Sequence, residues 1–308
     1  MGNMMDAAKR GTVHPSSQDK YEDTFFACGE LKKMTSLTLG NERKAIYQVD
    51  LKSRRPPMPW ITQYDLKGFI SASDGFLFYG LDWKLHVLRL KGRDPKSGPF
   101  NWDDVIFTPF EIRRSSACAA QRKIFISGSM DEISEKKVSM YDQGSKRFYA
   151  MTPMTQGRAR HSSLVWENLL VVVGGFYNKK MLPSVEAFDL KAGKWTVLPP
   201  LPQPLCHHAM CVWADKLIVA GGYLKNENRT DKVWSLDFNM MKDWEEWPPM
   251  ITPRDSHGLI PTEEGTLAAL GGNRGPPTAE VMQRDGKWTP LDLKADFIAL
   301  DKATCMRF

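Results

Sequence analysis

Short apolar runs that end in glycine recur along the chain and define its organisation. Three of them are nearly identical: Leu170–Gly175 (LVVVGG), Leu217–Gly222 (LIVAGG) and Leu267–Gly272 (LAALGG). Weaker copies precede them and end near Gly29, Gly80 and Gly128. Runs that are apolar throughout are typical of strands buried on both faces, and paired glycines suit a tight exit from such a strand. The pattern therefore predicts repeated buried strands.

The copies recur at a regular interval. Their first glycines are separated by 51, 48, 46, 47 and 50 residues, so six units fill the chain. Other positions repeat in phase with the glycines. In most copies, an aromatic or aliphatic residue followed by Asp closes the next strand, and an aromatic residue lies in the last strand. We expect a structural role for Gly29, Gly80, Gly128, Gly174, Gly175, Gly221, Gly222, Gly271, Gly272, Trp102, Trp195, Trp244 and Trp288. No amphipathic helical pattern of useful length occurs, which predicts an all-β fold.

This combination of apolar run, Gly-Gly, Phe-Asp or Tyr-Asp, and Trp resembles the kelch repeat, whose period is about 50 residues. A WD-type repeat would need Gly-His and a shorter period, and the chain has no Gly-His. The resemblance spans about residues 21 to 308. Over this range the chain is similar to the kelch domains of BTB-kelch proteins. The resemblance implies a six-bladed β-propeller of four-stranded blades over 21–308, with residues 1–20 as a disordered leader.

The end of the chain carries one more copy of a repeated strand. Small residues recur before a hydrophobic position in the strand that precedes each glycine run, and this strand is missing before Gly29. The C-terminal stretch Lys302–Phe308 fits the pattern with Ala303 and Cys305. We therefore predict that the C-terminal strand completes the first blade and removes its open edge. The same register makes Cys118, Cys211 and Cys305 buried small side chains.

Composition limits the classes of function. No apolar run approaches the roughly 20 residues that cross a bilayer, so no membrane association is expected. The net charge of +6 is spread along the chain, which argues against a nucleic-acid partner. Five cysteines include no C-x-x-C pair, and the first 20 residues lack a secretory signal. These features predict reduced thiols and a cytoplasmic or nuclear location.

Candidate catalytic chemistry is sparse. His161, His208 and His257 take equivalent places in three successive units and could suggest a metal site. Lys67 and Lys302 take the same place elsewhere and disfavour a cation. We therefore predict that the histidines are structural or line the channel, with no metal and no cofactor. No P-loop, G-x-S-x-G or H-E-x-x-H motif occurs. We expect a non-enzyme, with a small-molecule enzyme of the sialate-mutarotase or galactose-oxidase-like type as the alternative.

Basic and aromatic residues gather in the loops that the resemblance assigns to ligand binding. The predicted partner-binding residues are Tyr64, Arg113, Arg114, Arg158, Arg160, Tyr177, Lys179, Lys180, Tyr223, Arg229, Arg254 and Arg274. Arg158 and Arg254 each end a Met-x-x-x-Arg motif. Guanidinium groups suit carboxylates and phosphates, so we hypothesise binding of an acidic or phosphorylated protein segment.

The resemblance also implies a biological setting for such binding. It suggests the substrate adaptor of a cullin-type ubiquitin ligase, acting through a BTB or F-box domain absent from this chain. A stand-alone cytoskeletal or signalling scaffold is the alternative binding role.

Overall fold

The computed structural model describes residues 24–31, 44–50, 58–61, 69–73, 76–89, 101–225, 228–262, 265–272, 279–291 and 297–306. For the strands before residue 76 and after residue 296, only the backbone is described. No helix occurs in these ranges, as expected, and strands join through turns and loops. The predicted leader, residues 1–20, lies outside the described residues.

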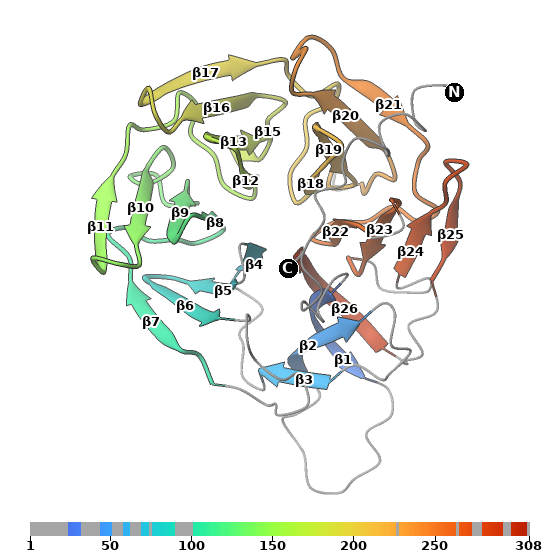
Figure 1. Cartoon of the computed structure of the whole chain (residues 1–308), viewed down its shortest axis with the longest axis horizontal. Helices are drawn as coiled ribbons and strands as arrows, with labels where there is room; N and C mark the ends of the chain where they lie inside the picture. Colours follow the sequence, from blue (N-terminus) through green and yellow to red (C-terminus); the bar gives the residue numbers. More distant parts are fainter. Residues whose placement is uncertain are drawn as a thin grey trace, which may run out of the picture.

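Six sheets of four strands form the blades of a propeller (Figure 1). Blade 1 contains β26 (Phe297–Met306), β1 (Thr24–Leu31), β2 (Lys44–Asp50) and β3 (Met58–Ile61); blade 2 contains β4 (Phe69–Ser73), β5 (Phe76–Leu81), β6 (Lys84–Arg89) and β7 (Asp104–Phe107); blade 3 contains β8 (Ser116–Ala120), β9 (Lys123–Ser127), β10 (Val138–Asp142) and β11 (Arg147–Ala150).

The other three blades follow in the second half of the chain. Blade 4 contains β12 (Ser162–Trp166), β13 (Leu169–Val173), β16 (Val185–Asp189) and β17 (Lys194–Leu198); blade 5 contains β18 (Ala209–Trp213), β19 (Lys216–Ala220), β20 (Val233–Asp237) and β21 (Glu245–Trp247); blade 6 contains β22 (Gly258–Pro261), β23 (Leu267–Leu270), β24 (Ala279–Met282) and β25 (Trp288–Pro290). A small ribbon, β14 (Phe176–Tyr177) with β15 (Lys180–Met181), extends from blade 4. The prediction of an all-β propeller is confirmed.

The C-terminal strand closes the ring. Five blades are built from strands that follow one another along the chain, whereas blade 1 has the order β26-β1-β2-β3. β26 pairs antiparallel with β1, from Thr24 opposite Met306 to Leu31 opposite Phe297. The inner strands contact one another in the order β4, β8, β12, β18, β22 and β26, and β26 also contacts β4. The predicted C-terminal closure is confirmed.

All strand pairs within the blades are antiparallel, so successive connections alternate between the two ends of the propeller. Different loops therefore lie at each end. At one end the second strand of each blade stops, its glycines follow, and the chain later enters the next inner strand. We name this end the loop face. At the other end lie the connections from the inner strand to the second strand in blades 2 to 6, and from the third strand to the outer strand in every blade. We name this end the hairpin face.

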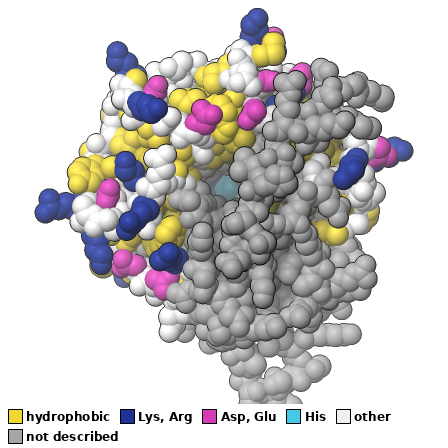
Figure 2. Space-filling view, viewed as in Figure 1, with side chains coloured by type: hydrophobic (Ala, Val, Ile, Leu, Met, Phe, Trp, Pro, Cys, Tyr) yellow, Lys and Arg dark blue, Asp and Glu magenta, His cyan; other side chains and the backbone are white. Residues whose placement is uncertain are grey.

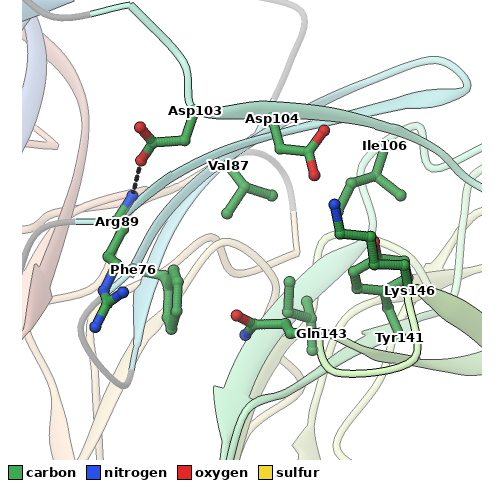
Figure 3. A pocket seen from close by; sticks show the side chains of 10 residues that line it. Phe76, Val87, Arg89, Asp103, Asp104, Ile106, Tyr141, Gln143 and Lys146 are labelled. Atoms are coloured by element: carbon green, nitrogen blue, oxygen red, sulfur yellow. Dashed lines mark hydrogen bonds between the residues drawn. The ribbon is translucent and has the colours of Figure 1, made fainter.

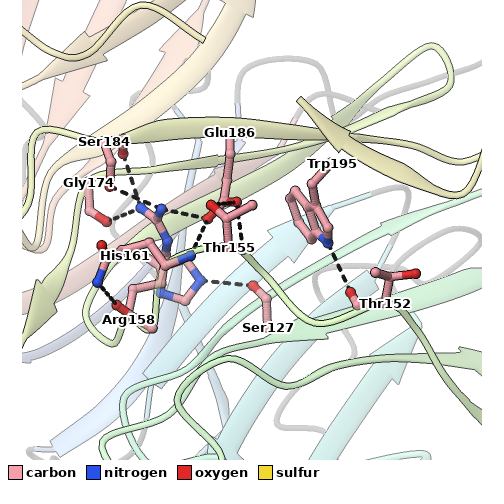
Figure 4. Close-up of polar contacts among 11 residues, drawn as sticks. Ser127, Thr152, Thr155, Arg158, His161, Gly174, Ser184, Glu186 and Trp195 are labelled. Atoms are coloured by element: carbon pink, nitrogen blue, oxygen red, sulfur yellow. Dashed lines mark hydrogen bonds and ion pairs between the residues drawn. The ribbon is translucent and has the colours of Figure 1, made fainter. Parts of the chain in front are cut away.

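Hydrophobic clusters fill the spaces between neighbouring blades. One cluster joins blades 4 and 5 through Val171, Val219 and Trp234, and similar clusters lie at the junctions of blades 2 and 3, 3 and 4, and 5 and 6. Three of the four predicted tryptophans, Trp195, Trp244 and Trp288, help to seal these junctions. The indole N–H of Trp195 donates to the Thr152 carbonyl of the previous blade at 2.9 Å (Figure 4). Two further bonds of this kind run from Trp244 to Pro199 and from Trp288 to Pro248.

The glycine pairs allow neighbouring blades to approach closely. Gly174 has a φ of +57°, and a Cβ atom there would lie 2.7 Å from the Leu205 carbonyl oxygen and 2.9 Å from Cε1 of His208. Gly175 is equally crowded by the Ala159 carbonyl and by Cβ of His161. One glycine of the pair therefore packs against the next blade and the other against the loop that enters its own blade. This packing explains why the apolar runs end in two glycines.

We expect Gly174→Ala to lower the free energy of unfolding by about 2–4 kcal/mol, because left-handed strain adds about 1–2 kcal/mol to the cost of the collision. Gly193→Ala is a matched control. Gly193 has a φ of +69°, but nothing lies within 4 Å of a Cβ atom there, so only about 1 kcal/mol of strain should appear. Urea denaturation of both variants measures the difference, and equal losses would contradict the packing role.

Candidate functional site

Two sets of loops build the loop face. One set follows the second strand of each blade, and the other enters the inner strand of the next blade. Among the described residues, the second set comprises 108–115, 151–161, 199–208 and 248–257. The space-filling view shows Lys and Arg side chains spread over the described blades with Asp and Glu among them (Figure 2). Surface charge alone therefore does not single out a site.

Four residues of the second set form a hydrogen-bonded arc around the axis. Arg114, Arg160, His207 and Ser256 each stand two residues before an inner strand and have φ angles of 60°, 54°, 56° and 52°. The backbone N–H of Arg160 donates to the Arg114 carbonyl at 2.7 Å. His207 N–H donates to Arg160 at 2.9 Å, and Ser256 N–H donates to His207 at 2.7 Å. We name these four residues the arc; it fixes equivalent positions of four successive blades relative to one another.

Two arginines of the arc carry charge that no described carboxylate balances. Burial lowers the pKa of Arg114, and the charges of Arg160 and Arg113 lower it further. The Arg160 guanidinium lies 5.4 Å from the centre of the Phe176 ring, and its buried Nε has no hydrogen-bond partner among the described residues. Within the same part of the chain, neither Arg114 nor Arg160 forms an ion pair. Like charges held close together favour a bound anion.

The opposite end of the arc is electrostatically balanced. Arg229 Nε lies 2.5 Å from Oδ1 of Asp255, and the Arg229 guanidinium lies 5.8 Å from the centre of the Tyr223 ring. Burial raises the pKa of Asp255, while Arg229, Ser256 and Tyr223 oppose that rise. Arg229 and Tyr223, both predicted to bind a partner, are thus already engaged with Asp255. The unbalanced positive charge lies on the side of blades 3 and 4.

Arg158 and Arg254 were expected to bind a partner, and the structure shows that this prediction is wrong. Both side chains are completely buried and form ion pairs within the fold. Arg158 Nη2 lies 2.7 Å from Oε1 of Glu186, and its Nη1 donates to the Gly174 carbonyl at 2.6 Å (Figure 4). Arg254 repeats the arrangement with Glu280 and the carbonyl of Gly271, both at 2.7 Å. These arginines fasten the entering loop to the first glycine and the third strand of the next blade.

The sequence held a signal for this role. Arg158 and Glu186 belong to the loop and third strand of one blade, and in the next blade Leu205 and Trp234 take the equivalent places. Leu205 and Trp234 are both buried in one hydrophobic cluster. The ionic pair Arg158–Glu186 of blade 4 is therefore replaced in blade 5 by the apolar pair Leu205–Trp234, with both members exchanged together. Glu186 and Glu280, which sequence reasoning missed, could have been found from this alternation.

The other predicted residues are distributed over the loop face. Arg113 is about half exposed, with its Nε 3.7 Å from Glu111. Lys179 is exposed at the turn of the small ribbon, as is Lys180, and Tyr177 beside them is partly buried. The charge of Glu135 and a hydrogen bond to it raise the pKa of Tyr177. Tyr64 and Arg274 lie outside the described residues.

The three repeated histidines are buried between the blades rather than open to a ligand. His161, His208 and His257 each place Cε1 within 3 Å of the Cβ position of a first glycine in the previous blade. Burial lowers the pKa of all three, and nearby Arg158 or Arg254 lowers it further. His161 Nε2 also lies 2.8 Å from the Ser127 hydroxyl (Figure 4). The predicted structural role of these histidines is confirmed by this packing.

Two cysteines bear on the predicted register of the inner strands. Cys118 is buried, and burial raises its pKa to about 12 despite a hydrogen bond from Ser163. Cys211 is half-buried and packs against the cluster between blades 5 and 6. The predicted burial is confirmed for Cys118, whereas Cys211 is buried only in part. The side chain of Cys305 lies outside the described residues. No helix in the described ranges is long and apolar enough to span a membrane.

Comparison with known proteins agrees with this architecture. Residues 151–293 match the model of the KLHDC2/KLHL20/DRC7 Kelch-repeats domain. A search of curated protein sequences finds no significant match. The solved structure titled "Structure of YjhT" is similar with a TM-score of 0.60 at 15% identity, covering 73% of this chain and 82% of that chain. At this identity the likeness concerns the fold alone. With its period, its glycine pairs and its closed ring of blades, the chain is a β-propeller whose residues 151–293 match the kelch-repeat family.

Proposed function

We propose that the chain recognises an acidic segment of a partner protein through Arg114 and Arg160 of the arc. The observation that carries the proposal is the unbalanced charge of these two side chains at the inner rim of the loop face. A carboxylate or phosphate would accept charge-assisted hydrogen bonds from both guanidinium groups and relieve their mutual repulsion. Kelch propellers commonly serve as protein-interaction modules, which supports a protein as the source of the anion.

The surroundings of the two arginines favour an extended peptide. Phe176 offers an aromatic surface beside Arg160, and Lys179 and Lys180 stand exposed on the adjoining ribbon. An acidic residue at the arc could thus be flanked by further acidic residues near the ribbon. We extend the proposal to substrate recognition for a ubiquitin ligase in the cytoplasm or nucleus, on the strength of the kelch resemblance and the cysteine pattern.

Peptide binding to Arg114→Ser/Arg160→Ser tests the proposal. Serine is the residue of blade 6 at this place of the arc, Ser256, where it adopts the same backbone conformation. Affinity for a fluorescein-labelled peptide with adjacent glutamates, or with phosphoserine, should fall about a hundredfold, because each charge-assisted hydrogen bond contributes about 1.5–3 kcal/mol. Fluorescence anisotropy measures the affinity.

Lys191→Ser/Lys194→Ser provides the matched control. Both lysines are exposed at the turn between β16 and β17 on the hairpin face, so the variant loses the same charge at a distant place. Its affinity should change less than about twofold at physiological salt, because screening is strong beyond about 8 Å. Equal losses in the two variants, or tight binding by the arginine variant, would contradict recognition at the arc.

A further inference from the structure

A pocket opens between blades 2 and 3 on the hairpin face, away from the arc. Its volume is about 390 Å³, within the size range of small-molecule sites. It is lined by Phe76, Val87, Arg89, Asp103, Asp104 and Ile106 from blade 2, and by Ile124, Tyr141, Gln143 and Lys146 from blade 3 (Figure 3). Most of these residues lie at the start of the second strands, at the end of the third strands or at the start of the outer strand of blade 2, and Gln143 and Lys146 lie in the turn between β10 and β11.

Blade 3 departs from the repeat at a position that lines the pocket. Gln143, Leu190 and Phe238 are equivalent residues, since each follows the Asp of the third strand and donates its N–H to the turn between the first two strands of its own blade. Phe238 is buried and stacks on Trp166 of the previous blade at 4.2 Å, and Leu190 packs into its own junction. Gln143 instead brings a polar amide to the junction of blades 2 and 3. Where its counterparts fill space, Gln143 lines a pocket.

The aromatic residue of the outer strand differs at the same junction. In blades 4, 5 and 6 a tryptophan indole bonds to the previous blade. Blade 3 has Phe148 at this place, tilted against Tyr141 with 4.9 Å between ring centres. A phenyl ring has no N–H to donate and is smaller than an indole. Two substitutions, at 143 and 148, thus weaken the seal of this junction relative to its neighbours.

The two walls of the pocket have complementary chemistry. Blade 3 presents hydrogen-bond donors: the Lys146 ammonium, the Tyr141 hydroxyl and the amide of Gln143, whose buried Nε2 has no acceptor among the described residues. Blade 2 presents the carboxylates of Asp103 and Asp104, and Arg89 lines the same wall. Asp103 accepts the backbone N–H of Arg89 at 2.7 Å, and Asp104 faces the pocket from its upper wall (Figure 3).

Apolar side chains line the space between the polar walls. Phe76, Val87, Ile106 and Ile124 supply hydrocarbon surface next to these donors and acceptors. A buried donor without an acceptor costs about 1–3 kcal/mol, so an oxygen placed at Gln143 Nε2 would be favoured. A ligand that fits this arrangement carries an anionic oxygen for blade 3, a cationic group for blade 2 and an apolar body between them.

We propose that this pocket binds a small zwitterion of the amino-acid class with an apolar side chain. The carboxylate of the ligand accepts hydrogen bonds from Gln143 and Lys146, and its ammonium group faces Asp104. The apolar side chain packs on Phe76, Ile106 and Ile124. The site is separate from the arc, and the proposal stands independently of peptide recognition there.

L-phenylalanine is a suitable probe because it carries all three groups. Isothermal titration calorimetry of the full chain should show saturable binding of one L-phenylalanine at low millimolar concentration. 3-Phenylpropanoate lacks the ammonium group and phenethylamine lacks the carboxylate, so each should bind at least about tenfold more weakly. Absence of saturable phenylalanine binding, or equal binding of all three compounds, would overturn the proposal.

Variants locate the binding within the molecule. Gln143→Leu introduces the residue of blade 4 at this place, so it should fold and should abolish phenylalanine binding. Asp104→Asn changes an exposed residue and should weaken binding about tenfold. Arg114→Ser/Arg160→Ser should bind phenylalanine like the unaltered chain. Unchanged binding in both Gln143→Leu and Asp104→Asn would exclude this pocket.

Discussion

Arg158→Met should lower the free energy of unfolding by about 3–5 kcal/mol, because it leaves the carboxylate of Glu186 buried without its cation. The Glu186 side chain is only 1% exposed, so water cannot take the place of the guanidinium. The substitution also removes the hydrogen bonds that Arg158 donates to the carbonyls of Gly174 and Ser184. Urea denaturation followed by tryptophan fluorescence measures the loss.

A double-mutant cycle separates the ion pair from simple packing. In Arg158→Met/Glu186→Leu both charges are gone, and the junction becomes apolar as it is at Leu205 and Trp234. Buried ion pairs replaced by hydrophobic residues of similar volume are often neutral for stability. We therefore expect the double variant to be clearly more stable than Arg158→Met, although the N–H and hydroxyl of Thr155 lose an acceptor. If the double variant lost as much free energy of unfolding as the two single variants together, the result would contradict this account.

Stability should fall steeply as the pH drops below about 6.5, the pKa of an unperturbed histidine. Burial, followed by the charge of Arg158, lowers the pKa of His208 to about 3 in the folded chain. The pKa values of His161 and His257 also lie well below 6.5. Between the two pKa values only the unfolded chain binds the proton, so acid favours unfolding. In that pH window, each histidine should lower the free energy of unfolding by about 1.4 kcal/mol for every unit by which the pH falls.

His208→Ser tests this pH dependence. Serine occupies the equivalent place in blade 3, where the Ser115 hydroxyl donates to the Gly128 carbonyl at 2.5 Å. The variant loses packing and is less stable at neutral pH, but its stability should decline less steeply in acid, by about 1.4 kcal/mol per pH unit. Unfolding free energies from about pH 7 to about pH 5 give both slopes. Equal slopes would show that His208 titrates in the folded chain.

The fold was predictable because its determinants are local and repeated. Runs such as Leu169–Val173 are mostly apolar in each copy, and the glycines at their ends meet the backbone of neighbouring loops. Those constraints recur in several blades, so the period alone identifies the architecture. Closure by β26 was predictable for the same reason, since one inner strand was missing at the start of the chain and present at its end.

The site was less predictable because charge alone does not reveal burial. Arg158 and Arg160 are two residues apart, yet the first is completely buried and the second lies in the arc. Whether an arginine is buried depends on the residue that pairs with it. For Arg158 that residue is Glu186, which lies 28 residues later in the chain. The pocket depends likewise on contacts between blades. Gln143 looks like an ordinary turn residue until it is compared with Leu190 and Phe238 in their junctions.

Closure by β26 has a consequence for how the protein is made. Synthesis delivers β1, β2 and β3 first, and the strand that borders β1 on the inside comes last. Until residues 297–306 leave the ribosome, the edge of β1 offers unpaired backbone groups that other chains can pair with. Every nascent chain therefore passes through a stage at which this open strand edge favours aggregation, and translation that stops before β26 would leave it there.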